Sequence, residues 1–291
     1  MAEQMVGIIG GTGLGDALAE RLIDRRTHEV ETPFGKTSGP ILVGKIGRRR
    51  IAFLNRHGQG HKLSPTDVPY AANIFALKKL GVRTLIASGA VGSLTDEIAP
   101  GHLVIVDQFI DKTFKRQNTF FQRFAAVHCE FAEPVCARLA EILCETAKGI
   151  HVVTHQKGCY VCIEGPQFST RAESLMHRAW GGDLIGMTAM PEAKLAREAQ
   201  ICYALVALPS DYDCWRPQQE GKDKQTLLKE IISNLQIATD SCLKLIEAIL
   251  KSDHRLLCQE CQCRKSMDMA VWTDQSVINP ADKEKLKVLF E

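Results

Sequence analysis

The chain has 291 residues, 45% of them hydrophobic and 24% charged, which is enough apolar material to bury one large core or two modest ones. This composition argues against a disordered or fibrous protein. The 36 basic and 34 acidic residues leave a formal net charge of +2, so no broad surface field would attract nucleic acid or an anionic membrane. Chemistry on a small molecule is therefore the expected class of function.

The N-terminus gives no sign of a targeting segment. Residues 1–6 have no basic cluster followed by an apolar stretch. No later apolar run approaches the roughly 18 residues of a membrane-spanning helix. We therefore expect a soluble, cytoplasmic protein with no nucleic-acid or membrane partner.

Eleven cysteines are scattered along the chain, and their odd number in a chain of this length favours reduced thiols over a disulfide framework. Cys258, Cys261 and Cys263 lie close together in the sequence, and their spacing could hold a soft metal ion. Four-coordinate zinc would need a further ligand such as His254. Reduced thiols are the favoured interpretation, and no metal site is expected.

Short apolar runs rich in β-branched residues predict strands at residues 6–9, 41–43, 51–54, 84–87, 103–106, 160–163 and 201–207. Two helices are predicted between them. Residues 70–80 place apolar side chains near one face and end at Gly81, and residues 191–200 start with a proline suited to a first helical turn. Both lead directly into a strand. This order predicts a mostly parallel α/β sheet with helices on both faces, where ligands collect at the carboxyl ends of strands.

Residues 227–250 carry apolar side chains at helical spacing, which predicts a long packed helix that closes the main domain. After Lys251 the composition becomes polar and cysteine-rich, with short apolar islands at residues 271–272 and 288–290. We therefore predict a main domain over residues 1–251 and a C-terminal appendage over residues 252–291, whose role the sequence does not indicate.

The first predicted strand runs into a glycine-rich turn at residues 10–13. Backbone N–H groups can approach an anion closely there, and the Thr12 hydroxyl adds a donor. The turn is not a dinucleotide fingerprint, because Asp16 or Leu18 replaces the third glycine in the two possible frames, and the turn lacks the lysine of a P-loop. A tight strand-to-helix turn explains these glycines equally well.

Two further segments follow predicted strands. Arg56 and His57 come after residues 51–54, and they offer a bidentate fork for phosphate oxygens and a second donor of adjustable charge. A solvated basic turn is the alternative. Residues 88–93 form a run of small side chains after residues 84–87, where a sugar or phosphate could lie against the backbone.

Four more residues could recognise a nucleoside. The Phe168 ring could stack on a purine and Met187 could pack against a ribose, although either residue is more often part of a core. Asp211 and Asp213 stand at i and i+2 after an apolar strand, so both would face one ligand if the chain stays extended. A carboxyl group with a raised pKa could share a proton with a purine leaving group. An ordinary turn pair of aspartates is the alternative.

Eight segments, in this order, resemble those of the 5′-methylthioadenosine phosphorylases, members of the trimeric purine-nucleoside phosphorylase superfamily. They are GIIGGTGL, TPFGK, RHG, YAANI, DQFID, IEGPQFSTRAE, MTAMPE and DYDCW. They span roughly residues 5–250, and together they are far more specific than any one of them. The resemblance implies a single-domain phosphorylase/hydrolase-like α/β fold, with a central mixed β-sheet flanked by helices, over residues 1–251. Residues after Lys251 have no counterpart in this resemblance.

The resemblance also implies roles for individual residues. The phosphate-binding set would be Thr12, Arg56, His57, Ala90 and Thr188. The nucleoside-binding set would be Phe168, Met187, Asp211, Asp213 and, from a neighbouring subunit, His128. Asp211 and Asp213 would be the catalytic pair at the N7 and N6 edge of adenine. A histidine lent by a neighbour implies a homotrimer. Inorganic phosphate is the implied co-substrate, and no metal or organic cofactor is implied.

The implied reaction is phosphorolysis of 5′-methylthioadenosine, and of adenosine or other 5′-modified adenosines, to adenine and a 5-methylthioribose 1-phosphate or its analogue. Phosphate would attack C1′ as the glycosidic bond breaks through an oxocarbenium-like state. One alternative is a phosphorylase for 6-oxopurine nucleosides or 5′-methylthioinosine, although such relatives carry asparagine where Asp211 stands. Another is a non-catalytic purine-binding protein, suggested by Gly89 and Gly186, which replace a threonine and an asparagine common in relatives. The broken glycine fingerprint disfavours a nicotinamide or flavin oxidoreductase.

Overall fold

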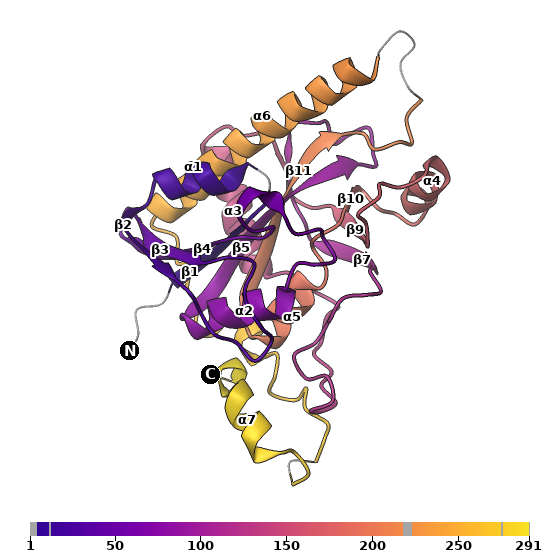
Figure 1. Cartoon of the computed structure of the whole chain (residues 1–291). Helices are drawn as coiled ribbons and strands as arrows, with labels where there is room; N and C mark the ends of the chain where they lie inside the picture. Colours follow the sequence, from indigo (N-terminus) through magenta and orange to yellow (C-terminus); the bar gives the residue numbers. More distant parts are fainter. Residues whose placement is uncertain (1–4, 12, 218–222, 275, 291) are drawn as a thin grey trace.

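The computed structural model describes residues 5–11, 13–217, 223–274 and 276–290 (Figure 1). Among these residues, 11 strands form a central mixed sheet. The strands are β1 Met5–Gly10, β2 Ile23–His28, β3 Ile41–Ile46, β4 Arg49–Asn55, β5 Val82–Ser93, β6 Leu103–Ile105, β7 Gln108–Lys112, β8 Thr154–His155, β9 Cys159–Ile163, β10 Leu184–Gly186 and β11 Cys202–Asp211. The seven strands predicted from apolar runs are all present, and the predicted α/β fold with a central mixed sheet is confirmed.

The sheet is mixed, although most of the strand pairs that the structure describes are parallel. Along its main path the order is β2-β3-β4-β1-β5-β10-β9-β7, and β11 pairs with both β5 and β6, while β6 also pairs with β8. The central pairs β1 with β4, β1 with β5 and β5 with β11 are parallel. The pairs β2 with β3, β3 with β4, β5 with β10 and β6 with β11 are antiparallel. The carboxyl ends of β1, β4, β5 and β11 therefore lie at one edge of the sheet.

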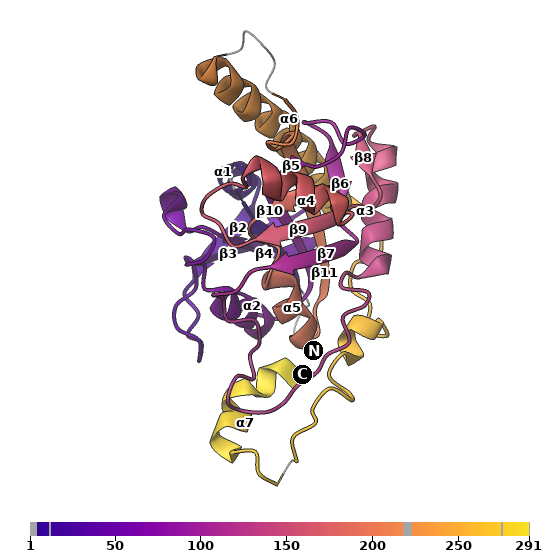
Figure 2. The same ribbon diagram turned by 90° about the vertical axis from the view of Figure 1, so that its right-hand side faces the viewer.

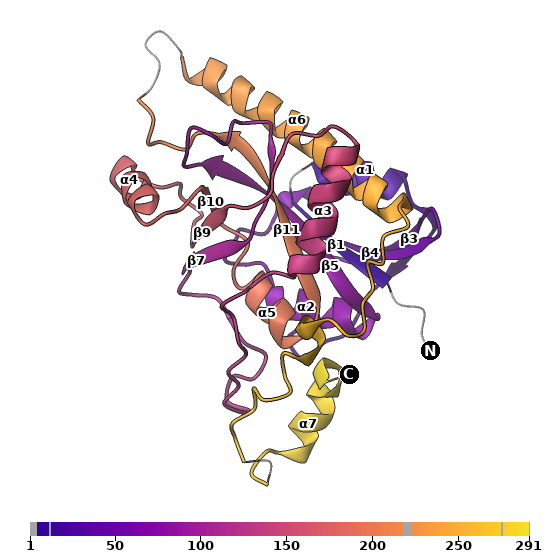
Figure 3. The same ribbon diagram turned by 180° about the vertical axis from the view of Figure 1, so that it is seen from behind.

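Helices cover both faces of this sheet (Figures 1 and 3). The described helices are α1 Leu14–Glu20, α2 Tyr70–Lys79, α3 Ala137–Gly149, α4 Arg171–Ala179, α5 Glu192–Glu198, α6 Lys224–Lys251 and α7 Pro280–Leu286, with 3₁₀ turns η1 Gln59–His61, η2 Gln262–Lys265 and η3 Lys287–Phe290. The side chains of α2 and α5 form one hydrophobic core with the sheet, and those of α1, α3 and α6 form a second. Within the described residues, no helix combines the length and the apolar character needed to cross a lipid bilayer.

The chain after α6 packs back onto the main body (Figure 2). Leu256 joins the core of α3 and α6, whereas Leu286 and Leu289 join the core of α2 and α5. The Gln200 side chain donates a hydrogen bond to the Leu289 carbonyl oxygen over 2.8 Å. The C-terminal residues therefore bury their few apolar side chains in the cores of the main body.

Candidate active site

Arg56 is the buried centre of the site. It follows β4 at the carboxyl edge of the sheet, and only 1% of its surface is exposed. Its Nε and Nη2 donate to the two carboxylate oxygens of Glu192 over 2.8 and 2.9 Å, and Nη1 donates to the Ser88 carbonyl oxygen over 2.7 Å. Burial alone would lower the pKa of Arg56, but the Glu192 carboxylate outweighs burial and raises it, so the guanidinium stays charged. The bidentate pair fixes the plane of the fork.

Two glycines leave space beside this guanidinium. Three of its five N–H donors are engaged in these bonds, which leaves one on Nη1 and one on Nη2. A Cβ at Gly11 would lie 3.5 Å from Arg56 Nη1, and a Cβ at Gly89 would lie 3.9 Å from the same nitrogen and 3.4 Å from Thr188 Oγ1. An oxyanion above these glycines would therefore face a guanidinium and a hydroxyl. This geometry brings the predicted residues Arg56 and Thr188 together from β4 and the turn after β10.

Gly89 stands where relatives commonly carry a threonine, and the structure shows how much room there is for a side chain at this position. The 3.4 Å between a Cβ at this position and Thr188 Oγ1 is ordinary van der Waals contact. A Cβ at residue 89 would therefore not displace its neighbour. The glycine leaves the space above Arg56 slightly wider and removes one potential hydroxyl donor.

Gly186 is different, because a neighbouring side chain fills the space beside it. A Cβ at Gly186 would lie 2.0 Å from the Tyr160 hydroxyl oxygen, so an asparagine there would collide with the tyrosine. The Thr188 backbone N–H donates to the same hydroxyl oxygen over 3.3 Å. Tyr160 is 1% exposed, so its hydroxyl supports the turn that carries Thr188 from within the core. The Tyr160 hydroxyl therefore requires a glycine at residue 186.

His57 lies beside Arg56 and is held by the backbone. Its Nδ1 lies 2.8 Å from the Leu63 carbonyl oxygen, and its ring stacks on His61 with centroids 4.2 Å apart. Burial lowers the pKa of His57 to about 4, so the ring is neutral at neutral pH. In the neutral tautomer that donates from Nδ1 to Leu63, Nε2 is an acceptor. His57 is therefore suited to receive a hydrogen bond from a protonated phosphate oxygen rather than to supply positive charge.

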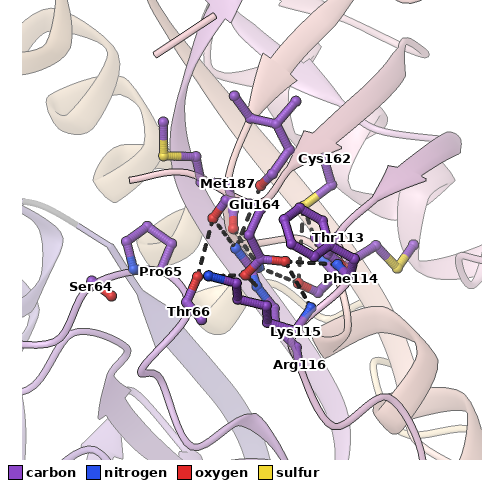
Figure 4. Close-up of polar contacts among 12 residues, drawn as sticks. Ser64, Pro65, Thr66, Thr113, Phe114, Lys115, Arg116, Cys162, Glu164 and Met187 are labelled. Atoms are coloured by element: carbon purple, nitrogen blue, oxygen red, sulfur yellow. Dashed lines mark hydrogen bonds and ion pairs between the residues drawn. The ribbon is translucent and has the colours of Figure 1, made fainter. Parts of the chain in front are cut away.

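Glu164 and Arg116 form a second buried ion pair, which Figure 4 shows. Arg116 Nε donates to Glu164 Oε1 over 3.0 Å, and the Arg116 and Glu164 side chains are only 1% and 7% exposed. Arg116 Nη1 donates to the carbonyl oxygens of Met187 and Met190, each over 2.6 Å. The ion pair therefore fastens the segment after β7 to the loop that carries Met187 and Thr188.

Glu164 should stabilise the fold in a pH-dependent way. Burial would raise its pKa, but the hydrogen bond from Thr66, the backbone N–H groups of Phe114 and Lys115 and the Arg116 guanidinium together lower it to about 2. A depressed carboxyl pKa stabilises the native state above the unfolded value near 4.3, and this contribution is lost as the pH falls toward 2. We expect Glu164→Gln to lower the free energy of unfolding by about 3 kcal/mol at pH 7, and by about half as much near pH 3. Urea denaturation across this pH range checks it, and a pH-independent difference would contradict it.

Asp211 ends β11, and Asp213 lies two residues beyond it. The Asp213 backbone N–H donates to Asp211 Oδ1 and the Ser210 hydroxyl donates to Asp211 Oδ2, both over 2.7 Å. Asp213 has a φ of 50°, and its carboxylate accepts a hydrogen bond from the Ser174 hydroxyl of α4. The pair is therefore a turn in which the two carboxylates are held by different partners, not an extended segment.

Gly92 allows this turn to lie against β5. It pairs with Asp211 in the sheet, and a Cβ at Gly92 would lie 3.2 Å from Asp211 Oδ1 and 3.1 Å from the Asp213 Cβ. Burial raises the pKa of Asp211, although the hydrogen bonds from Ser210 and Asp213 oppose the shift. Since Gly89 and Gly92 are three residues apart on β5, the aspartates lie roughly 10 Å along the strand from the space beside Arg56.

The other predicted residues lie around these two groups. Ala90 is exposed on β5 between Gly89 and Gly92. Met187 is half-buried and approaches Gly165 so closely that a Cβ there would overlap its sulfur. Phe168 is 86% exposed, but Ser169 beside it accepts a 3.3 Å hydrogen bond from the Cys214 thiol, which places this loop next to the aspartates. Its purine contact stays a prediction. Thr12 lies outside the described residues.

His128 lies in a different part of the same chain. Its backbone N–H donates to the Ala270 carbonyl oxygen over 2.8 Å, and its ring meets Trp272 edge-on with centroids 5.2 Å apart. It lines a hollow of about 580 Å³ together with Lys194 and Glu198. None of Arg56, Thr188 or Asp211 lines this hollow, so His128 does not join the described site of its own chain.

Sequence reasoning missed the residues that position the site. Glu192 was part of the quoted MTAMPE segment, and its place at the start of a helix after proline gave a usable signal. Glu164 was likewise visible within IEGPQFSTRAE. Arg116 gave none, because a lone arginine in the polar run at residues 113–119 reads as a solvated loop.

Two quoted segments prove to be structural. Asn73 accepts a hydrogen bond from the Ser38 backbone N–H over 2.9 Å and donates to the Ser38 hydroxyl over 2.7 Å. Phe34 packs on Phe75 and Phe120, with ring centroids 5.5 and 5.2 Å apart. The helix α2, which contains YAANI, and the loop that contains TPFGK therefore hold each other in place.

Known proteins of similar sequence and structure show the family to which the chain belongs. The family model described as the phosphorylase superfamily matches residues 5–251. The S-methyl-5′-thioadenosine phosphorylase of Geobacter sulfurreducens is 44% identical over 291 residues, covering 99% of this chain and 98% of its own. That of Xenopus tropicalis is 45% identical, covering 87% of this chain and 92% of its own. Because the Geobacter alignment takes in 99% of this chain, the expectation that residues after Lys251 have no counterpart was wrong.

Solved structures give the same result. A methylthioadenosine phosphorylase from an Antarctic soil metagenomic library superposes with a TM-score of 0.87 at 39% identity, covering 100% of both chains. The methylthioadenosine phosphorylase of Schistosoma mansoni in complex with adenine has a TM-score of 0.77 at 36% identity, covering 86% of this chain and 93% of its own. The chain therefore belongs to the phosphorylase superfamily and, within it, to the family of the S-methyl-5′-thioadenosine phosphorylases.

Proposed function

We propose that this chain cleaves 5′-methylthioadenosine with inorganic phosphate, giving adenine and 5-methylthioribose 1-phosphate. One observation carries the proposal: Arg56 and Thr188 converge above Gly11 and Gly89, and Asp211 lies farther along β5, opposite Gly92. An anion site and an acidic site roughly 10 Å apart along β5 leave room for a ribose between them. Family membership supports the same chemistry.

At the phosphate end, the proposed contacts are the remaining Arg56 N–H groups, the Thr188 hydroxyl and the His57 ring, with Thr12 and Ala90 also in the set. Phosphate held there attacks C1′ from one side of the sugar. Its negative charge stabilises the oxocarbenium-like state as the bond to the base breaks. The chain needs no metal or organic cofactor for this step, since the co-substrate supplies both the nucleophile and the charge.

At the base end, Asp211 shares a proton with N7 of adenine as the base leaves, and Asp213 assists at the N6 edge. A neutral carboxyl can donate a hydrogen bond, and burial of Asp211 favours that neutral form. Phe168 and Met187 contact the purine and the ribose.

A product assay tests the function. The purified chain is incubated with phosphate and a matched panel of adenosine, 5′-methylthioadenosine, inosine and 5′-methylthioinosine, and released bases are measured by chromatography. The proposal expects phosphate-dependent release of adenine, fastest from 5′-methylthioadenosine. A preference for hypoxanthine release would instead support a 6-oxopurine phosphorylase, and binding without turnover would support a non-catalytic purine-binding protein.

The phosphate site gives a sharper prediction. Thr188→Val preserves shape but removes the hydroxyl, and a hydrogen bond to a charged group contributes about 1.5–3 kcal/mol. We expect the KM for phosphate to rise by roughly 10-fold to 100-fold, with a smaller change in the KM for nucleoside. Steady-state kinetics at varied phosphate measures this. Thr84→Val is the matched control, because Thr84 is also buried but donates to the Leu256 carbonyl oxygen instead. An equal effect of both variants would contradict the placement.

We further propose a homotrimer in which His128 of each subunit enters the 5′-substituent pocket of its neighbour. The position of His128 away from Asp211 in its own chain supports this arrangement. Sedimentation velocity of the purified chain tests it, and a monomer at working concentration would refute it.

The phosphorylase domain would be residues 1–251, which end where the family match ends, and residues 252–291 would be its appendage. The proposed location is the cytoplasm, where eleven free cysteines would stay reduced.

A further inference from the structure

Four cysteines from distant parts of the sequence meet at the junction between the main body and the C-terminal appendage. Cys136, Cys202, Cys261 and Cys263 place their sulfur atoms within 4.8 Å of one another. Cys136 Sγ and Cys261 Sγ are 3.7 Å apart. All four are free thiols, three of them buried and Cys261 half-buried. The phosphorolysis proposed above uses none of them.

The spacing of these sulfur atoms suits a metal ion rather than a disulfide. A tetrahedral zinc ion with four Zn–S bonds of about 2.3 Å holds its sulfur atoms about 3.8 Å apart. A disulfide joins two sulfur atoms at about 2.05 Å, well below the 3.7 Å between Cys136 Sγ and Cys261 Sγ. We propose that Cys136, Cys202, Cys261 and Cys263 bind one structural zinc ion. Binding converts four thiols to thiolates and releases four protons to solvent.

The main body holds two of the ligands rigidly. Cys136 is the residue immediately before α3, and its backbone N–H donates to the Tyr203 carbonyl oxygen over 2.8 Å. Cys202 is the first residue of β11. This backbone hydrogen bond therefore sets the two thiols side by side on elements that are anchored in the core.

The appendage supplies the other two ligands from one short turn. Cys261 precedes η2 and Cys263 lies within it, and the Arg264 backbone N–H donates to the Cys261 carbonyl oxygen over 2.8 Å. Arg138 of α3 donates to the carbonyl oxygens of Arg255 and Leu256, over 2.5 and 3.0 Å, and so fastens the chain leading to this turn. A metal ion with two ligands from the main body and two from the appendage would link these two parts of the chain.

The surroundings also suit a tetrathiolate centre. Zinc with four thiolates carries a net charge of −2, which burial disfavours unless a cation lies close. The Arg138 guanidinium lies beside Cys136 and Cys202, and among the described residues its buried Nε has no hydrogen-bond partner. An N–H donor to a ligand sulfur is the usual outer contact of such centres. The half-buried Cys261 leaves a route by which the ion could enter.

This site differs from the one that the sequence suggested. Cys261 and Cys263 are ligands as their spacing allowed, but the partners are Cys136 and Cys202 rather than Cys258 and His254. The zinc would take no part in catalysis. Cys202 and Asp211 stand at opposite ends of β11, and its ten residues span roughly 30 Å. The ion instead gives the appendage a role, which is to hold its cysteine turn against the first residue of β11.

Metal analysis of the full chain tests the proposal. The protein is produced with added Zn²⁺, purified under reducing conditions and analysed by plasma mass spectrometry. We expect about one zinc per chain, loss of that zinc in Cys263→Ser, and its retention in Cys258→Ser, the matched control from the same segment. Removal of zinc from the wild type with a chelator should lower Tm, and added Zn²⁺ but not Mg²⁺ should restore it.

A second measurement does not depend on any variant folding. Co²⁺ in place of zinc should give the sulfur-to-metal charge-transfer and visible bands of a tetrahedral tetrathiolate. The proposal is overturned if the wild type holds no metal and its four thiols titrate freely, or if peptide mapping without reductant finds disulfides among them. It is also overturned if Cys258→Ser loses the metal to the same extent as Cys263→Ser.

Discussion

Replacing Asp211 with asparagine is expected to lower kcat for 5′-methylthioadenosine by about 10²-fold to 10⁴-fold, the usual contribution of a positioned general acid. The amide keeps the shape, and its oxygen can still accept from the Asp213 backbone N–H, whereas the Ser210 hydroxyl loses its acceptor and must turn to accept from the new NH2 group. The amide cannot share a proton with N7. KM for nucleoside should change far less than kcat, since the lost interaction forms mainly as the base leaves. Relative activity toward 6-oxopurine nucleosides should rise, because the amide can serve an O6 and N7 edge.

The pH profile separates this role from simple damage to the fold. Burial raises the pKa of Asp211, so the wild type should lose activity on the alkaline side as this carboxyl ionises. Asp211→Asn has nothing to ionise there and should lack that limb. Asp107→Asn is a matched control, because Asp107 also accepts a backbone hydrogen bond, from Gly158 over 2.9 Å. Wild-type kinetics in Asp211→Asn would refute the assignment.

Removing Glu192 should have the largest effect on stability. Glu192→Ala leaves the Arg56 guanidinium buried without its partner, and breaking a buried ion pair in this way costs about 3–5 kcal/mol. The Tyr203 hydroxyl, which donates to Glu192 over 3.0 Å, loses its acceptor as well. The free energy of unfolding in urea measures the loss. The same reasoning warns that Arg56→Ala would mix unfolding with any effect on phosphate binding.

Two further variants make this prediction specific. Asp253→Ala removes an ion pair with Arg48 in which both side chains are largely exposed, and we expect a cost below about 1 kcal/mol. Glu192→Gln removes the charge and leaves one acceptor oxygen in place of two. Its loss of unfolding free energy should therefore lie between those of Glu192→Ala and Asp253→Ala. If Glu192→Ala were no more destabilising than Asp253→Ala, the buried pair would not hold the site together.

The fold could be predicted where strands are buried on both faces. β1, β5 and β11 are almost wholly buried, so they read as continuous apolar runs. β2 could not be recognised, because an edge strand of sequence IDRRTH exposes nearly all its side chains. β10 could not be recognised either, because it is only three residues long. α4 could have been found, since Thr170 and Glu173 form a capping box at its start.

Some residues of the site could likewise be predicted from the sequence, and others could not. Arg56, Thr188 and Asp211 stood out because each follows a predicted strand within a recognisable segment, and strand ends of an α/β sheet meet at one edge. The partners that fix them could not be paired from sequence, since Glu192 is 136 residues from Arg56. The four cysteines of the cluster could not be grouped from the sequence for the same reason, which is their distance along the chain. Spacing rules see Cys261 and Cys263, but only the folded chain brings Cys136 and Cys202 to them.

The pairing of Arg56 with Glu192 also bears on how the anion reaches its site. The carboxylate cancels the guanidinium charge at close range, so the approaching ligand meets oriented N–H dipoles rather than a long-range Coulomb field. Dipoles act over a few ångströms, well inside the Debye length of about 8 Å at physiological ionic strength. The rate of phosphate capture should therefore be nearly insensitive to added salt, unlike that of an enzyme that steers its substrate with unpaired charge.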